Sequence, residues 1–155
     1  MSVKDVINGV VGSKDFKEKV NETSYLAHLF VKKEEMQWQI GFYNPEKDKM
    51  IVFLENGSFL LEDDVYKEEG SVTELSLDNV KVEFEQASSI VDESLQKYPQ
   101  HQPTSQIFIL QNLNQRILWN VTVITSTLHV LQLRIDANTG EVIVEKLENV
   151  MNFKV

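Results

Sequence analysis

The sequence contains no cysteine, which excludes disulfide bonds, thiolate zinc sites, iron–sulfur clusters and cysteine nucleophiles. It is also poor in basic residues, with 15 Lys and Arg against 24 Asp and Glu, so its formal charge is −9. Nonspecific binding of DNA or RNA requires a basic surface that neutralises phosphates, and the charge therefore argues against nucleic acid as a partner. A basic protein partner is compatible with this charge.

Long hydrophobic runs are absent as well. No stretch approaches the ~18 apolar residues of a membrane-spanning helix, so no membrane partner is expected. Near the N-terminus, Lys4, Asp5 and Asn8 interrupt the apolar residues, and a signal-peptide core is missing. As written, the chain is expected to stay in the cytoplasm. If a leader was trimmed, an extracytoplasmic location is expected instead.

Hydrophobic periodicity predicts an α+β fold in which helices pack on one face of a curved antiparallel sheet. A first helix is predicted over residues 3–22, broken at Gly12 and restarted by a cap at Ser13. A second helix is predicted over residues 79–97, capped by Asp78. Alternation and turn signals, above all the hairpin pair Asn56-Gly57, predict strands at 25–32, 37–42, 50–54, 58–62, 73–77, 105–111, 116–125, 128–136, 141–146 and 150–154.

The two halves of the chain share an order of elements, which suggests an internal duplication. Trp38 and Trp119 begin matching alternations of apolar residues, and Gly57 and Gly140 occupy similar turns. The period of about 75–80 residues is too long for a solenoid repeat. We therefore divide the chain into units 1–74 and 75–155, which pack as one compact body because no Gly-, Pro- or Ser-rich linker separates them. A chance likeness of two hairpin modules is the alternative.

The second half resembles a known family. The segments Leu118-Trp-Asn-Val-Thr-Val and Leu131-Gln-Leu-Arg-Ile-Asp-Ala-Asn-Thr-Gly-Glu-Val-Ile look like a PepSY domain, and the turn matches the family's Asp-Ala-x-Thr-Gly-Glu pattern at Asp136, Ala137, Thr139, Gly140 and Glu141. This resemblance covers about residues 75–146. The first half fits at Trp38 and Gly57 but lacks the Asp-Ala…Thr-Gly signature. The whole chain thus resembles two tandem PepSY-like units, the first of them diverged.

The resemblance implies a non-catalytic interaction or regulatory module. PepSY-like domains are usually non-catalytic parts of protease propeptides, membrane-associated regulators and secreted proteins, and a protease-inhibiting role has been proposed for them. The resemblance therefore implies that this chain binds or inhibits a peptidase or another protein. It implies no cofactor, and the family has no catalytic residues to carry over. This chain departs from the family's common setting, since it shows no signal peptide, membrane span or attached peptidase.

Residues that could carry chemistry are scattered. His28, His101 and His129 are interpreted as isolated histidines, and no Gly-x-Ser-x-Gly nucleophile elbow occurs. The segment from Asp136 to Gly140 shares part of a calcium-loop pattern, but its glycine is fifth and Leu147 stands where the twelfth-position glutamate belongs. A hairpin turn explains the same residues, and no metal site is predicted.

Trp38 and Trp119 are the candidate partner-binding residues. On an exposed sheet face they would anchor a partner, whereas in the core they would be packing anchors, which their alternation with Ile, Phe and Val favours. Two alternatives to an interaction module remain open. One is a small-ligand carrier that uses a concavity between helix and sheet, and the other is an enzyme with paired carboxylates.

Overall fold

The computed structural model describes residues 2–65 and 72–152. Its first two helices begin where serine side chains satisfy free backbone N–H groups. α1 (Val3–Val11) follows Ser2, whose Oγ accepts a hydrogen bond from the Asp5 N–H at 3.1 Å. α2 (Lys14–Lys19) follows Ser13, which accepts from the Phe16 N–H at 3.2 Å. The predicted break at Gly12 and the predicted cap at Ser13 are both confirmed.

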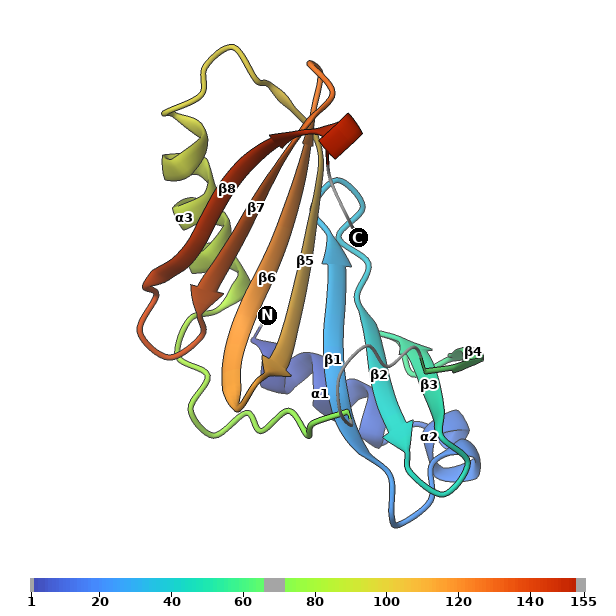
Figure 1. Cartoon of the computed structure of the whole chain (residues 1–155). Coiled ribbons are helices and arrows are strands. Elements are labelled where there is room, and N and C mark those ends of the chain that lie inside the picture. The colour runs from blue at the N-terminus through green and yellow to red at the C-terminus, as the bar shows by residue number, and fades with distance from the viewer. Residues whose placement is uncertain (1, 66–71, 153–155) are drawn as a thin grey trace.

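Eight antiparallel strands form one sheet in the order β4-β3-β2-β1-β5-β6-β7-β8. The strand bounds are β1 (Tyr25–Lys32), β2 (Gln39–Asn44), β3 (Lys49–Leu54), β4 (Phe59–Asp64), β5 (Pro103–Leu113), β6 (Arg116–Thr125), β7 (His129–Asp136) and β8 (Val142–Asn149). Each half of the chain contributes four consecutive strands, and the halves join where β1 pairs with β5. The two halves therefore build a single continuous sheet (Figure 1).

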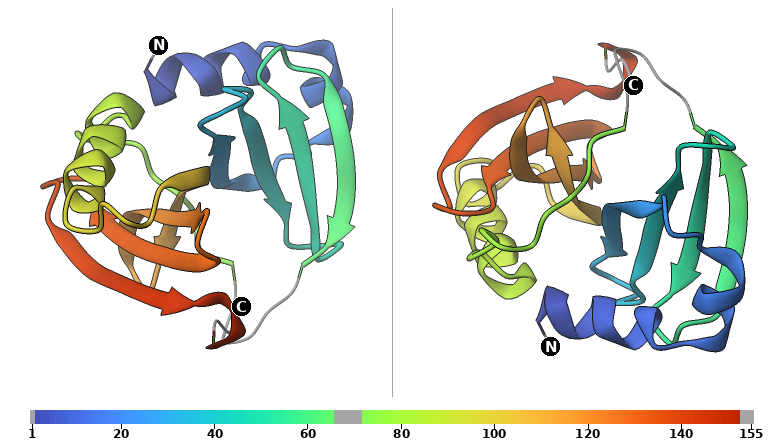
Figure 2. Two further views of the ribbon diagram at one scale, coloured as in Figure 1. Left: turned by 90° about the horizontal axis from the view of Figure 1, so that it is seen from above. Right: turned by 90° about the horizontal axis from the view of Figure 1, so that it is seen from below.

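Within the described residues, the three α-helices pack on the same face of this sheet (Figures 1 and 2). Helix α3 (Phe84–Leu95) buries Phe84, Ala87 and Val91, and these join the apolar side of α1 in one core cluster. Between helices and sheet, the ring of Phe84 lies 4.9 Å from the ring of Phe108. The α+β fold with helices on one sheet face is thus confirmed.

Three predicted elements differ from the structure. Helix α3 begins at Phe84 rather than at residue 79, because the backbone N–H groups of Lys81 and Val82 both donate to the Ala137 carbonyl and hold this segment outside the helix. Gln86 then accepts from the Glu83 N–H, so Glu83, not Asp78, precedes the helix.

The predicted strands at 73–77 and 150–154 were wrong where the structure describes them. Residues 73–77 form no strand; the Leu75 N–H donates to the Leu26 carbonyl, and its side chain is buried in the core. Val150–Asn152 form a short 3₁₀ helix, whereas residues 153–155 lie outside the described residues. Apolar alternation at residues 73–77 therefore reflects the burial of Leu75 rather than a strand ladder.

Within residues 2–65 and 72–152, no helix is long and apolar enough to cross a membrane.

Candidate binding face of the sheet

The face of the sheet opposite the helices is the candidate functional site. Side chains two apart along a strand share a face, so each core residue alternates with an outward one. Within the described part of the chain no helix covers this outward surface, which we call the open face (Figure 2). Its central row crosses five strands through residues that are all half-buried, namely Phe30, Ile109, Asn120, Arg134 and Val144.

The centre of the open face is apolar. Phe30 on β1 lies directly opposite Ile109 on β5, and Ile107 lies one step further along the same face. Opposed aromatic and β-branched side chains attract one another across strands. All three remain half-buried although the helices lie on the other side. An apolar centre of this kind retains surface that burial against another molecule would remove from water.

His28 also lies on this side of the sheet but is not an exposed ligand. Its ring packs over Gly41 of the neighbouring strand, where a Cβ atom added to the glycine would lie 2.6 Å from His28 Nδ1. Burial lowers the pKa of His28 to about 4, so the ring is neutral at physiological pH. The histidine therefore fills the space left by a glycine, and its role in the fold is packing.

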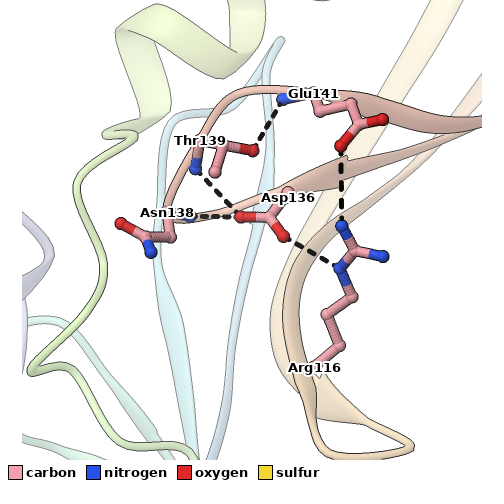
Figure 3. A network of polar contacts seen from close by, with 5 residues as sticks. All are labelled: Arg116, Asp136, Asn138, Thr139 and Glu141. Atoms are coloured by element: carbon pink, nitrogen blue, oxygen red, sulfur yellow. Dashed lines mark hydrogen bonds and ion pairs between the residues drawn. The ribbon is translucent and has the colours of Figure 1, made fainter.

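The turn from Asp136 to Glu141, at one end of β7, is a closed polar network (Figure 3). Asp136 Oδ1 accepts hydrogen bonds from the backbone N–H groups of Asn138 at 2.8 Å and Thr139 at 2.9 Å. Its Oδ2 accepts from Arg116 Nε at 2.8 Å, and Arg116 Nη2 lies 3.7 Å from Glu141 Oε2.

Asp136 therefore serves as the structural centre of that turn. Burial alone would raise the pKa of Asp136, but hydrogen bonds from the Thr139 backbone, Arg116 and the Asn138 backbone outweigh it and hold the pKa below its ordinary value. Gly140 supplies the positive φ of +81° that the turn needs. The predicted hairpin turn is confirmed, and its carboxylate is already fully engaged.

A second carboxylate joins α3 to the sheet. Glu145 of β8 accepts hydrogen bonds from Ser94 and, at 2.8 Å, from the Tyr98 hydroxyl, and Lys97 Nζ lies 3.2 Å from its Oε1. Burial raises the pKa of Glu145, but the contacts with Ser94, Tyr98 and Lys97 lower it by more. The hydrogen bond to Glu145 raises the pKa of Tyr98. These contacts fix the end of α3 on the sheet edge.

Two of the predicted isolated histidines lie together. The ring centroids of His101 and His129 are 4.4 Å apart, and Thr127 contacts both: its hydroxyl bonds His101 Nδ1 and its carbonyl lies 3.0 Å from His129 Nδ1. Across the described ranges, no group of three or more His, Cys, Asp or Glu side chains is placed to hold a metal ion. The histidine pair therefore belongs to the packing of the β6–β7 turn.

The structure places both tryptophans in the core. Trp38 is 5% exposed and Trp119 is 0% exposed, and their ring centroids lie 6.3 Å apart. Trp119 Nε1 donates to the Val82 carbonyl at 2.8 Å. Since neither indole reaches the surface, the core alternative explains both residues, and direct contact with a partner is not available to them.

The region between helices and sheet, where a ligand-holding concavity was an alternative, is filled by Trp38, Phe84, Phe108 and Trp119. Two surface hollows of about 410 and 320 Å³ lie instead around Pro103, where α3 ends and β5 begins. Tyr98 and His101 line the larger one. Neither Phe30 nor Ile109 lines either hollow.

Sequence reasoning considered an exposed sheet face as a binding surface but missed the residues that form its apolar centre, although a signal was present. Residues Ile107-Phe108-Ile109-Leu110 form an uninterrupted apolar run within a strand. Such a run shows that both faces of the strand are apolar, and not only the face toward the core. Phe108 and Leu110 are fully buried, so Ile107 and Ile109 must supply the apolar outward face.

Comparison with known proteins supports the fold alone. No family model matches the chain, and no curated protein matches it. The chain is similar to the crystal structure of a putative lipoprotein from Clostridium difficile, with a TM-score of 0.59 and 13% sequence identity. The similarity covers 96% of this chain and 93% of that one. The two chains therefore share their fold along nearly the whole length.

Proposed function

We propose that the protein is a non-catalytic binding module that docks on a protein partner through the open face. The observation that carries the proposal is the distribution of helices: all three pack on one side of an eight-stranded sheet. On the other side, Phe30, Ile107 and Ile109 form a half-buried apolar centre. A protein interface commonly combines an apolar centre with a polar surround.

A protein fits this surface better than a small molecule does. The open face is a broad row of side chains across five strands rather than an enclosed pocket, and small-ligand sites are concave. Polar groups surround its apolar centre, among them Asn120, Thr122 and Gln132. A partner that covers the centre would gain apolar burial while the surround stays hydrogen-bonded.

The class of partner that we propose is a peptidase, or another protein that the chain binds or inhibits. The resemblance of the turn at Asp136 to PepSY domains supports this class, since inhibition of peptidases has been proposed for that family. We further propose that the chain arose by duplication of one PepSY-like unit. In support, each half consists of helix followed by four antiparallel strands, in β1–β4 and again in β5–β8. The fold shared with a putative lipoprotein supports an extracytoplasmic location.

Gentle purification of the tagged chain from its own host, followed by native mass spectrometry, tests the proposal. The variants F30S and I109S remove apolar surface from the open face, while L128S removes a side chain that is 68% exposed at the β6–β7 turn. We expect one protein to co-purify with the wild type and L128S and to be lost with F30S and I109S. Denaturant melts establish that all three variants are folded.

Two results would overturn the proposal. One is a partner that F30S and I109S retain as well as the wild type does, which would move binding to another surface. The other is a bare chain or a chain that carries a small-molecule mass, which would favour the carrier hypothesis and direct attention to the hollow lined by Tyr98 and His101.

A further inference from the structure

The Arg134 side chain on the open face has no polar partner among residues 2–65 and 72–152, although the chain is rich in acidic groups. The sequence has two arginines and 24 acidic residues. Arg116 forms contacts with Asp136 and Glu141, whereas no hydrogen bond or ion pair joins the Arg134 side chain to any described residue. Its Nε is buried and unsatisfied. A buried donor without an acceptor is costly, and this one is charged.

Asn120 directly opposite carries an unsatisfied group of the other kind, an acceptor without a donor. The two residues form a register pair between β6 and β7, and Asn120 Oδ1 is also buried without a hydrogen-bond partner. Ile109 borders the pair on one side and Val144 on the other. Since the Asn120 oxygen is an acceptor, the group that a ligand would have to supply at this place is an acceptor for the Arg134 guanidinium.

The neighbouring charges on this face are already engaged. Asp136, two residues along β7, accepts from Arg116 and from its own turn. Lys146 on β8 lies 2.8 Å from Glu148, its own ion-pair partner. Neither of these two neighbouring carboxylates, Asp136 and Glu148, is therefore free to pair with Arg134.

We propose that Arg134 receives a carboxylate side chain of the docked protein partner. This inference rests on the proposed function and specifies the chemistry of the contact. The planar guanidinium matches a carboxylate with two parallel hydrogen bonds.

The contact selects the partner and fixes its orientation rather than drawing it in from a distance. A chain of charge −9 repels an acidic protein at long range. Complementarity at Arg134 is therefore local: a single Asp or Glu of the partner meets a single Arg beside an apolar centre. Arginine is enriched among the residues whose truncation most weakens protein interfaces, and such residues lie where water is excluded.

Binding of the co-purified partner to charge variants tests the inference. R134Q removes the charge and the donor fork, R134K keeps the charge alone, and K14Q removes one charge from α2 on the helix side, where the side chain is 86% exposed. We expect the dissociation constant to rise about ten- to hundred-fold for R134Q and by less for R134K. K14Q should bind as the wild type does.

Carbodiimide cross-linking of R134K gives a second readout. The reagent joins the introduced amine to a carboxylate in direct contact, and peptide mapping should locate one Asp or Glu of the partner. Wild-type affinity of R134Q together with no such cross-link overturns this inference. If F30S and I109S still abolish binding in that case, the proposed function stands. If R134Q, F30S and I109S all bind the partner as the wild type does, the proposed function itself is refuted.

Discussion

Substitution of Gly41 by alanine probes how tightly the open face is packed. An added Cβ would lie 2.6 Å from His28 Nδ1, well inside contact distance, so the ring or the strand must move. Forcing extra carbon into a packed site typically costs about 1–3 kcal/mol, and we expect G41A to destabilise by about 2 kcal/mol. Urea denaturation monitored by tryptophan fluorescence measures this change in the free energy of unfolding.

A double-mutant cycle assigns the cost to His28. In the background of H28A the ring is gone, and alanine should then be neutral or slightly stabilising, because glycine in a strand is costly by itself. The coupling free energy should therefore exceed about 1 kcal/mol. Equal destabilisation by G41A with and without His28, or none in either, would show that the contact is not what requires glycine.

Acidification tests the same packing. Burial depresses the folded-state pKa of His28 from 6.5 to about 4, so the unfolded chain binds the proton more readily. The neutral histidine's contribution to stability is therefore complete above pH 6.5 and is lost as pH falls from there to about 4. Part of the side chain still reaches solvent, so this loss is at most about 3 kcal/mol. H28A should remove this component of the pH dependence, and an unchanged pH profile would contradict it.

Two further predictions concern the helix-covered side. W119A should lower the free energy of unfolding by about 3–5 kcal/mol, since it empties a fully buried site and leaves the Val82 carbonyl unpaired, and a loss below about 1 kcal/mol in a urea melt would contradict the core assignment. E145Q should lower the pKa of Tyr98 toward its ordinary value, because the carboxylate that accepts the hydrogen bond of the phenol is gone. Phenolate absorbance against pH measures this shift, with Y98F identifying the band, and an unmoved titration would show that Glu145 is not its cause.

Sequence periodicity predicted most of the fold because local signals and tertiary packing agree there. The break at Gly12, the cap at Ser13 and the hairpin at Asn56-Gly57 are local, and each appears as expected. The predicted start of α3 was wrong because the Ala137 carbonyl, far along the chain, accepts hydrogen bonds from the N–H groups of residues 81–82. A long-range acceptor of this kind leaves no trace in the neighbouring residues.

The candidate site was harder to predict than the fold. Alternation of Trp38 and Trp119 with apolar residues correctly favoured the core, but a strand pattern alone does not say which face helices cover. Ile107 and Ile109 became outward residues only because Phe108 and Leu110 face the helices. Whether Arg134 has an ion-pair partner depends on which acidic side chains lie nearby. These neighbours follow from the register of β6, β7 and β8, which the sequence alone does not give.

The most direct test of the account is hydroxyl-radical footprinting of the complex between the chain and its co-purified partner. The method reports side-chain exposure residue by residue. If the open face is the docking surface, Phe30, Ile107 and Ile109 should lose most of their oxidation in the complex, while Leu128 at the β6–β7 turn keeps its own. Unchanged oxidation of these three residues, with protection on the helix side instead, would contradict the account.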